Sequence, residues 1–224
     1  MQRIFHTPEG VRDIYSQECS RKQKLQEKLH RVFHQYGFED IETPTFEYFE
    51  VFSKEVGTIP SRELYKFFDR EGNTLVLRPD FTPSVSRACA TYFNPEKEVV
   101  SLCYTGNTFI NNSSFRGRLK ETTQMGVERM GDDSPEADAE ILAMTVECLL
   151  ATGLTEFQVS VGQVDYYKAI FAQTGLSQEE EEELRELISQ KNYFGVEELV
   201  KNKNMDKSLA RVLSQLPQMF GSTE

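Results

Sequence analysis

The segment that most constrains the fold is Leu102–Glu128, LCYTGNTFINNSSFRGRLKETTQMGVE. Near its start Tyr104, Gly106, Thr108 and Ile110 share one parity, and near its end Gln124, Gly126 and Glu128 share one parity, which predicts two β-strands. Between them, residues 111–118 are polar and basic and are rich in turn formers, which predicts a loop. The segment therefore predicts two strands joined by a basic loop.

The second predicted strand carries two polar side chains on one face. A period of two places Gln124 and Glu128 together, with Gly126 leaving open space between them, while Met125 and Val127 face a core. An amide, a gap and a carboxylate could form the floor of a site for a small ligand with an ammonium group. An exposed polar strand face fits the same periodicity, and the residues alone do not decide between the two.

A second polar group precedes a predicted helix at Ser84–Tyr92. The run RPDFTP, at residues 78–83, contains Asp80 and Thr82, either of which could cap this helix, with Pro83 in its first turn. On the residues alone, capping is favoured over a role in ligand binding.

The rest of the chain carries further helical and strand patterns. A helix with Ser16 as its N-cap is ended by Gly37 and followed by a short strand that Pro44 stops. The later elements are a hairpin over 65–78, a helix from Ser134 to Gly153, a half-buried strand over 157–161, a capping box of Ser177 with Glu180, and helices near 196–200 and 208–216.

Charge and cysteine usage narrow the classes of function. The 224 residues carry a formal net charge of −11, whereas a nucleic-acid surface needs clustered basic residues, so nucleic-acid binding is not expected. The four cysteines stand singly, and no histidine accompanies a cysteine pair, so no metal site is expected. Scattered thiols fit a reducing compartment. No apolar run reaches the length of a membrane span and no signal peptide opens the chain, so a soluble cytoplasmic protein is expected.

Taken together, these patterns resemble the class II aminoacyl-tRNA synthetases, in the branch of the histidine-tRNA ligases. That branch has a motif 2 with a basic G-R loop followed by Q-x-G-x-E, matched here at residues 116–118 and 124–128. The opening P-E-G-x-R-D and the series G-F-x-x-I-x-T-P of the branch are matched at residues 8–13 and 37–44. The resemblance covers nearly the whole chain.

The resemblance implies an α+β fold, that of the class II synthetase catalytic core, in which helices flank an antiparallel sheet. It also implies a single domain over residues 1–224 that lacks the C-terminal motif 3 region and any anticodon-binding domain. The helix and strand at about 16–43 resemble motif 1, which implies that they form a homodimer interface.

The ligand site that the resemblance implies consists of Asp80, Thr82, Gln124 and Glu128. In histidine-tRNA ligases, a run R-P-E-x-T and the motif 2 strand hold the amino group of histidine. Here the acid of that run is Asp80, which is one methylene shorter. The form R-P-D-x-T is more similar to the non-catalytic relatives of the ligases than to the ligases themselves.

The start of motif 2 departs from the ligases. Ile110 stands where they have an arginine that contacts the phosphate of ATP, and Asn112 replaces their glutamate. Isoleucine offers no charge and no donor, and losing one such group typically lowers the rate by about two to three orders of magnitude. Arg78, Arg116 and Arg118 are candidate phosphate-binding residues. An enzyme would need a substitute cation there, for which Arg78 is the only obvious nearby candidate, while Arg116 and Arg118 could equally belong to a solvated loop without a ligand.

The regulatory subunits of ATP phosphoribosyltransferase keep the synthetase fold but tend to lose its catalytic arginines and lack the anticodon-binding domain. Resemblance to them implies a subunit of histidine biosynthesis, without catalytic residues or cofactor. Such a subunit associates with the short-form catalytic subunit and confers feedback by histidine. One alternative is a histidine-tRNA ligase fragment that activates histidine with ATP. Another is a ligand-sensing synthetase-like domain with an unrelated regulatory partner.

Overall fold

The computed structural model describes residues 6–53, 59–112, 117–203, 205–216 and 221. The chain divides into two compact units, residues 1–157 and residues 158–224. The sequence predicted one domain and gave no sign of this boundary. That both units act as one domain stays a prediction.

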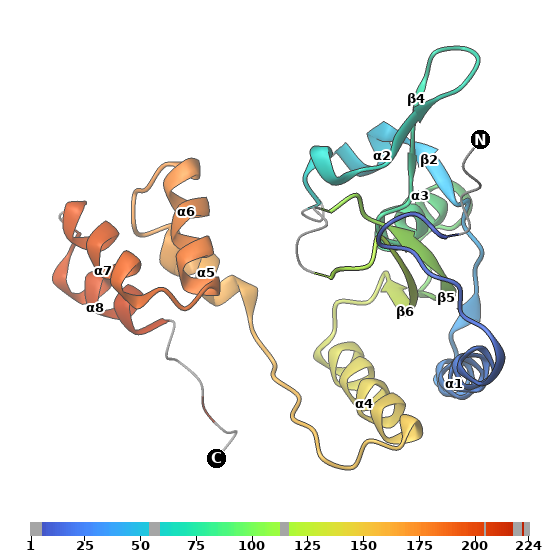
Figure 1. The fold of residues 1–224 in the computed structure, drawn as a ribbon. Helices are drawn as coiled ribbons and strands as arrows, with labels where there is room; N and C mark the ends of the chain where they lie inside the picture. Colours follow the sequence, from blue (N-terminus) through green and yellow to red (C-terminus); the bar gives the residue numbers. More distant parts are fainter. Residues whose placement is uncertain (1–5, 54–58, 113–116, 204, 217–220, 222–224) are drawn as a thin grey trace. The chain divides into compact units, whose positions relative to one another are not determined.

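The first unit is built around a three-stranded sheet with the order β1-β5-β6 (Figure 1). Strands β5 (Val100–Phe109) and β6 (Glu121–Met130) pair antiparallel along their whole length, which confirms the two strands predicted from the sequence. The short strand β1 (Glu39–Asp40) runs parallel to β5, so the sheet is mixed and not purely antiparallel as predicted.

A second, antiparallel sheet in this unit has the order β2-β4-β3. Its strands are β2 (Phe46–Tyr48), β3 (Lys66–Phe68) and β4 (Thr74–Leu77). The pairing of β3 with β4 confirms the predicted hairpin over 65–78. A short helix α2 (Phe49–Ser53) and a 3₁₀ turn η1 (Ser61–Glu63) lie between β2 and β3 in the sequence.

Helices cover both faces of the first sheet. Helix α3 (Thr82–Tyr92) packs against the side chains of β5 that have even numbers, among them Leu102 and Tyr104. Helices α1 (Ser16–Gln35) and α4 (Pro135–Thr152) lie side by side against the opposite face, where Cys103 is buried (Figure 1). Met125 and Val127 of β6 pack into that second core, as predicted. The period of two in β5 and β6 therefore separates two cores.

The ends of the helices follow the capping signals only in part. Ser16 is the first helical residue and Tyr15 occupies the N-cap position without a side-chain cap, so the prediction of Ser16 as N-cap is wrong. The predicted start of α4 is confirmed, because the hydroxyl of Ser134 accepts a hydrogen bond from the N–H of Ala137. Gly153 ends that helix in the left-handed conformation, with φ +97°.

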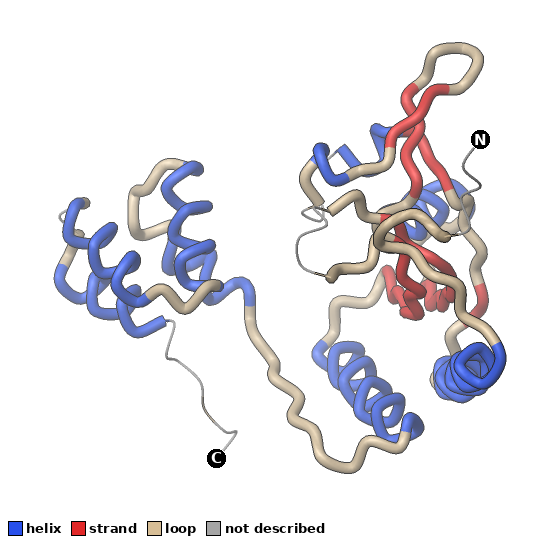
Figure 2. Tube along the Cα trace, viewed as in Figure 1, coloured by secondary structure: helices blue, strands red, loops and turns tan. Residues whose placement is uncertain are grey.

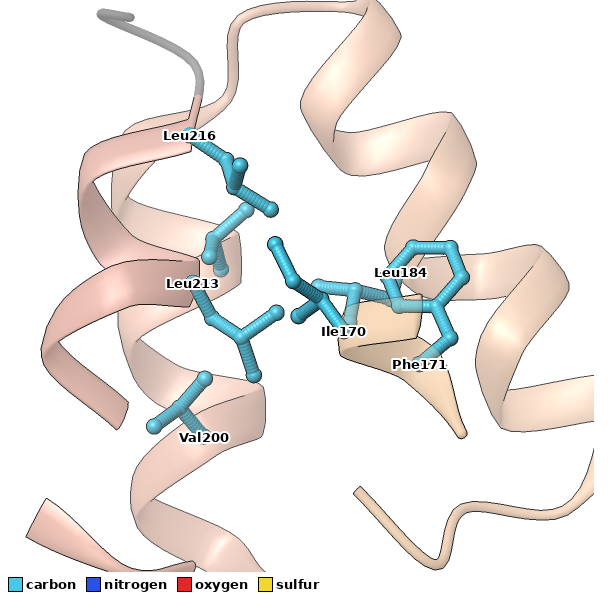
Figure 3. Packing of buried hydrophobic residues seen from close by; sticks show 7 residues of the cluster. Ile170, Phe171, Leu184, Val200, Leu213 and Leu216 are labelled. Carbon is cyan, nitrogen blue, oxygen red and sulfur yellow. The ribbon is translucent and has the colours of Figure 1, made fainter. Parts of the chain in front are cut away.

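The described part of the second unit contains helices and no strand (Figure 2). The helices are α5 (Val164–Phe171), α6 (Gln178–Ser189), α7 (Tyr193–Asn202) and α8 (Lys207–Gln215). Their apolar faces enclose one core, in which Ile170, Leu184 and Leu213 point toward one another (Figure 3). The capping box of Ser177 with Glu180 and the two predicted C-terminal helices are confirmed.

The half-buried strand predicted over residues 157–161 is wrong. The segment forms no strand, and its apolar side chains Phe157, Val159 and Val161 are all exposed. Alternation of apolar and polar residues produces a strand only when another strand supplies its hydrogen bonds, and no described strand pairs with this segment. In the described ranges, no helix combines the length and the apolar character that crossing a membrane requires.

Candidate functional site

The four residues of the predicted ligand site lie together at the start of α3, against the face of β6. The hydroxyl of Thr82 donates a hydrogen bond to Oε1 of Glu128 at 2.6 Å. The amide of Gln124 donates from Nε2 to Oδ1 of Asp80 at 3.0 Å. All four side chains are half-buried, so two residues of one strand and two of one helix start meet as the sequence predicted.

The prediction that Gly126 leaves open space between Gln124 and Glu128 is wrong. Tyr104 is the partner of Gly126 in the β5–β6 ladder, and its phenol lies over the glycine, where a Cβ atom would collide with the Tyr104 hydroxyl. This hydroxyl lies 3.4 Å from Oε1 of Glu128 and donates a weak hydrogen bond to it. Gly126 therefore makes room for Tyr104.

Tyr104 is a site residue that the sequence reasoning missed. Its ring stacks on the ring of Phe81 with centroids 4.3 Å apart and planes 8° from parallel. Phe81 belongs to the RPDFTP run, so the stack fixes the start of α3 over β5. The signal was present in the sequence: in an antiparallel pair of strands, a bulky aromatic opposite a glycine often covers it.

The capping role predicted for Asp80 and Thr82 is wrong. Helix α3 starts at Thr82, and Phe81 occupies its N-cap position with no side-chain cap. Oδ1 of Asp80 instead accepts from the N–H of Phe81 at 2.7 Å and from Gln124. Pro83 lies in the first turn as predicted. Both polar side chains thus contact β6, and Asp80 also binds the N–H of Phe81, the residue before the helix.

Burial and charge act together on the acids of the site. Burial raises the pKa of Glu128, and the negative charge of Asp80 raises it further. Hydrogen bonds from Thr82 and Tyr104 oppose the shift, because they favour the ionised carboxylate. Burial also raises the pKa of Tyr104, followed by the charge of Glu128, so this phenol stays protonated and remains a donor. The site therefore brings two acids close together, and a cation beside them would be stabilised.

The guanidinium of Arg78 is bound within the protein. Nε donates to the carbonyl of Asn107 at 2.8 Å, and Nη1 donates to the carbonyl of Thr43 at 2.9 Å. The group also lies over the ring of Phe81, at 4.1 Å from its centroid, and burial lowers the pKa of Arg78. These contacts tie β5 to the segment before β2. Binding of a phosphate by Arg78 would have to use the donors of Nη2, in a side chain that is 8% exposed.

The remaining phosphate-site candidates lie in the loop between β5 and β6. Arg118 is exposed, and Arg116 lies outside the described residues. Ile110 follows the end of β5 and is half-buried, with its N–H bonded to the carbonyl of Lys120 at 2.9 Å. Asn112 donates from its amide to the carbonyl of Leu119 at 3.3 Å. At the position of the ligases' arginine, the structure therefore places an apolar side chain.

Comparison with known proteins identifies the family of the chain. The model of the histidyl-tRNA synthetase family matches residues 10–224. The chain belongs to this family.

Within the histidyl-tRNA synthetase family, the chain is similar to proteins named ATP phosphoribosyltransferase regulatory subunit. Identity is 42% over 220 residues to the one from Acetivibrio thermocellus, covering 98% of this chain and 53% of the relative. It is 39% over 220 residues to the one from Ruminiclostridium cellulolyticum, covering 98% and 52%. The chain thus spans about half the length of these relatives.

A solved structure supports the same placement. The chain superposes with a TM-score of 0.82 and 32% identity on a protein of Bacillus halodurans described as an ATP phosphoribosyltransferase regulatory subunit/histidyl-tRNA synthetase. The match covers 96% of this chain and 56% of that one. The predicted α+β fold of the class II synthetase type is confirmed, as is the predicted similarity to the regulatory subunits.

Proposed function

We propose that this chain is a non-catalytic regulatory subunit of ATP phosphoribosyltransferase in histidine biosynthesis, and that it binds histidine as the feedback ligand. The names of the similar proteins support the role. The observation that carries the proposal is a cluster of two carboxylates, an amide and a hydroxyl, together with an apolar side chain at the position where the ligases have a phosphate-binding arginine. The former is the group of Asp80, Thr82, Gln124 and Glu128, and the latter is Ile110.

The cluster suits the amino group of an amino acid. An ammonium group has three donors and no acceptor, and the cluster presents two carboxylates, each an acceptor in its own hydrogen-bonded pair. Hydrogen bonds from a charged donor to a carboxylate are about twice as strong as hydrogen bonds between neutral groups. An ammonium group between the two acids would also relieve the repulsion between Asp80 and Glu128, which contributes to the raised pKa of Glu128. Histidine is the amino acid that the family resemblance implies.

The alternative, a ligase fragment that activates histidine, requires a cation near Ile110. Arg78 was the candidate, but its guanidinium is held by the carbonyls of Asn107 and Thr43 and by the ring of Phe81. Without such a cation, the charge that develops on the phosphates of ATP during adenylation is not neutralised. These contacts favour the regulatory function over the ligase.

Regulation by histidine requires that the ligand change the assembly with its partner. A ligand shifts an equilibrium only by its difference in affinity for the two states. If the complex with the catalytic phosphoribosyltransferase subunit has an active and an inhibited state, histidine must bind the inhibited state more tightly. A homodimer through the helix and strand at 16–43 is part of the same proposal.

The test combines two measurements on the same purified chain. Calorimetric titration with histidine should show saturable binding. Exchange of labelled pyrophosphate into ATP in the presence of histidine should not rise above background. Exchange at a rate typical of a synthetase would refute the non-catalytic role, and a chain that binds no histidine would refute the ligand site.

A further inference from the structure

Four side chains of the types that bind metal ions meet on the face of the sheet opposite to the proposed histidine site. His30 and His34 lie one turn apart on α1, so both imidazoles project from the same side of the helix. Asp40 and Cys103 are partners in the parallel pairing of β1 with β5, so their side chains share one face of the sheet. Helix α1 packs against that face, which brings the two pairs together.

The turn between α1 and β1 fixes this arrangement. Gly37 has φ +78°, a conformation that side chains rarely allow. Its N–H bonds to the carbonyl of His34 at 3.1 Å, and the N–H of Phe38 bonds to the carbonyl of Phe33 at 3.1 Å. These two bonds form the Schellman motif that ends many helices. The chain therefore reverses at once, and Asp40 returns beside the last turns of α1.

The polar atoms of the cluster converge on one small volume. Oδ1 of Asp40 lies 2.6 Å from Nε2 of His30, and Oδ2 lies 2.9 Å from Nε2 of His34. Sγ of Cys103 lies 3.5 Å from Oδ1 of Asp40. One ligand atom from each of the four residues lies within 4.8 Å of all the others. In a tetrahedral zinc site with bonds of about 2.0–2.3 Å, neighbouring ligand atoms are separated by about 3.3–3.8 Å.

We propose that His30, His34, Asp40 and Cys103 form a binding site for a divalent ion of the zinc type. Two imidazoles, a thiolate and a carboxylate are a ligand set that zinc accepts in tetrahedral geometry. The thiolate and the imidazoles select against magnesium and calcium, which prefer oxygen ligands. On binding, the Cys103 thiol releases its proton to the solvent, and coordination bonds replace the hydrogen bonds to Asp40.

The accessibility of the four residues suits entry of an ion. Cys103 is 1% exposed and forms the floor, whereas Asp40 and the imidazoles lie at the surface. A hydrogen-bonded cluster without a metal would also satisfy Asp40. The two alternatives differ in whether Cys103, whose Sγ lies 3.5 Å from Oδ1 of Asp40, binds a metal as its thiolate. A bound ion would join α1 to both β1 and β5.

The experiment uses the purified chain without any histidine tag, titrated with Co²⁺ as a spectroscopic probe of zinc sites. One equivalent should produce the near-ultraviolet charge-transfer band of a cobalt–thiolate bond and the intense visible bands of tetrahedral cobalt. Zn²⁺ should then remove both sets of bands. Cys103→Ser should abolish the charge-transfer band, while the matched control Cys19→Ser, on α1 but outside the cluster, should keep it.

A second variant keeps the proposal testable if Cys103→Ser does not fold. His34 is exposed, so His34→Gln should leave the fold intact. It should weaken Co²⁺ binding by at least about tenfold, since even the loss of a residue that only orients a ligand typically costs 10- to 100-fold. Zn²⁺ should raise the melting temperature of the wild type and not that of His34→Gln. Absence of saturable one-to-one binding, or a cobalt spectrum that Cys103→Ser and His34→Gln leave unchanged, would overturn the proposal.

Discussion

Replacing Glu128 by glutamine tests the proposed histidine site with a minimal change of shape. Glutamine has the same length and retains an oxygen that can accept the hydrogen bond of Thr82, now 2.6 Å from Glu128. What it removes is the negative charge that would face the ammonium group of histidine. We expect Glu128→Gln to bind histidine about 30-fold more weakly than the wild type, a loss of about 2 kcal/mol.

The magnitude follows from the burial of the site. Loss of one partner of a buried, hydrogen-bonded charge pair costs about 2–5 kcal/mol. Glu128 is half-buried and glutamine keeps its acceptor, so the lower end of this range applies. Glu128→Ala also deprives the Thr82 hydroxyl of its acceptor, so its loss should be larger.

The assay is calorimetric titration of the wild type and of each variant with histidine at one pH and salt concentration. Glu136→Gln is the matched control, because it makes the same charge change at an exposed position in the first turn of α4. Since the pKa of Glu128 is raised, its ionisation disfavours the folded chain. This contribution to stability is present below the unfolded pKa of the carboxyl and is lost as pH rises through the folded pKa. Without ligand, Glu128→Gln should therefore be at least as stable as the wild type at neutral pH. Equal affinities of wild type and Glu128→Gln would refute the reasoning.

Three further outcomes are expected. The pKa of Glu128 is raised, and a bound ammonium group would lower it, so the affinity for histidine should increase as the pH rises through the raised pKa. Calorimetric titrations over this pH range that show no increase in affinity would contradict the expectation. Gly126→Ala should lower the free energy of unfolding by about 1–3 kcal/mol, because the added Cβ would collide with Tyr104. Gly162→Ala is the control, since a Cβ there meets nothing within 4 Å. Denaturant unfolding that shows equal effects of the two substitutions would contradict the packing of Tyr104 over Gly126. Light scattering should show a homodimer, and a monomer at micromolar concentration would contradict an interface at 16–43.

The elements that the sequence predicted well are those with strong local signals. The period of two in Gln124 and Glu128 placed both side chains on one face, and the structure keeps them there. Ser134 with Pro135 and Ser177 with Glu180 marked helix starts correctly. In each case, a local spacing rule decides the structure and tertiary packing agrees with it.

The failures concern residues whose roles depend on tertiary packing. Asp80 is a residue type that often caps helices, but in the fold β6 lies close by and Gln124 donates a hydrogen bond to its carboxylate. Arg78 was expected near phosphate, but the folded chain surrounds it with backbone carbonyls. The alternation at 157–161 has no described strand beside it. Local patterns predict an element, but they do not say which distant group will compete for a side chain.

The cluster of His30, His34, Asp40 and Cys103 is a further case in which local patterns do not reveal partners that are distant in the sequence. The absence of a C-x-x-C pair led to the expectation of no metal site. However, cysteine spacing only detects ligands that are close in sequence. Here Cys103 reaches the two histidines through the parallel pairing of β1 with β5, and a parallel pair was not part of the predicted sheet.

The most direct test of the proposed function measures the rate at which a short-form catalytic subunit from the same organism transfers a phosphoribosyl group to ATP. The account predicts little activity without this chain, saturable activation when the chain is added, and inhibition of the activated complex by histidine. In the complex formed with Glu128→Gln, activation should persist while inhibition requires about 30-fold more histidine. A rate that is unchanged by the chain, or inhibition that Glu128→Gln leaves unaltered, would contradict the account.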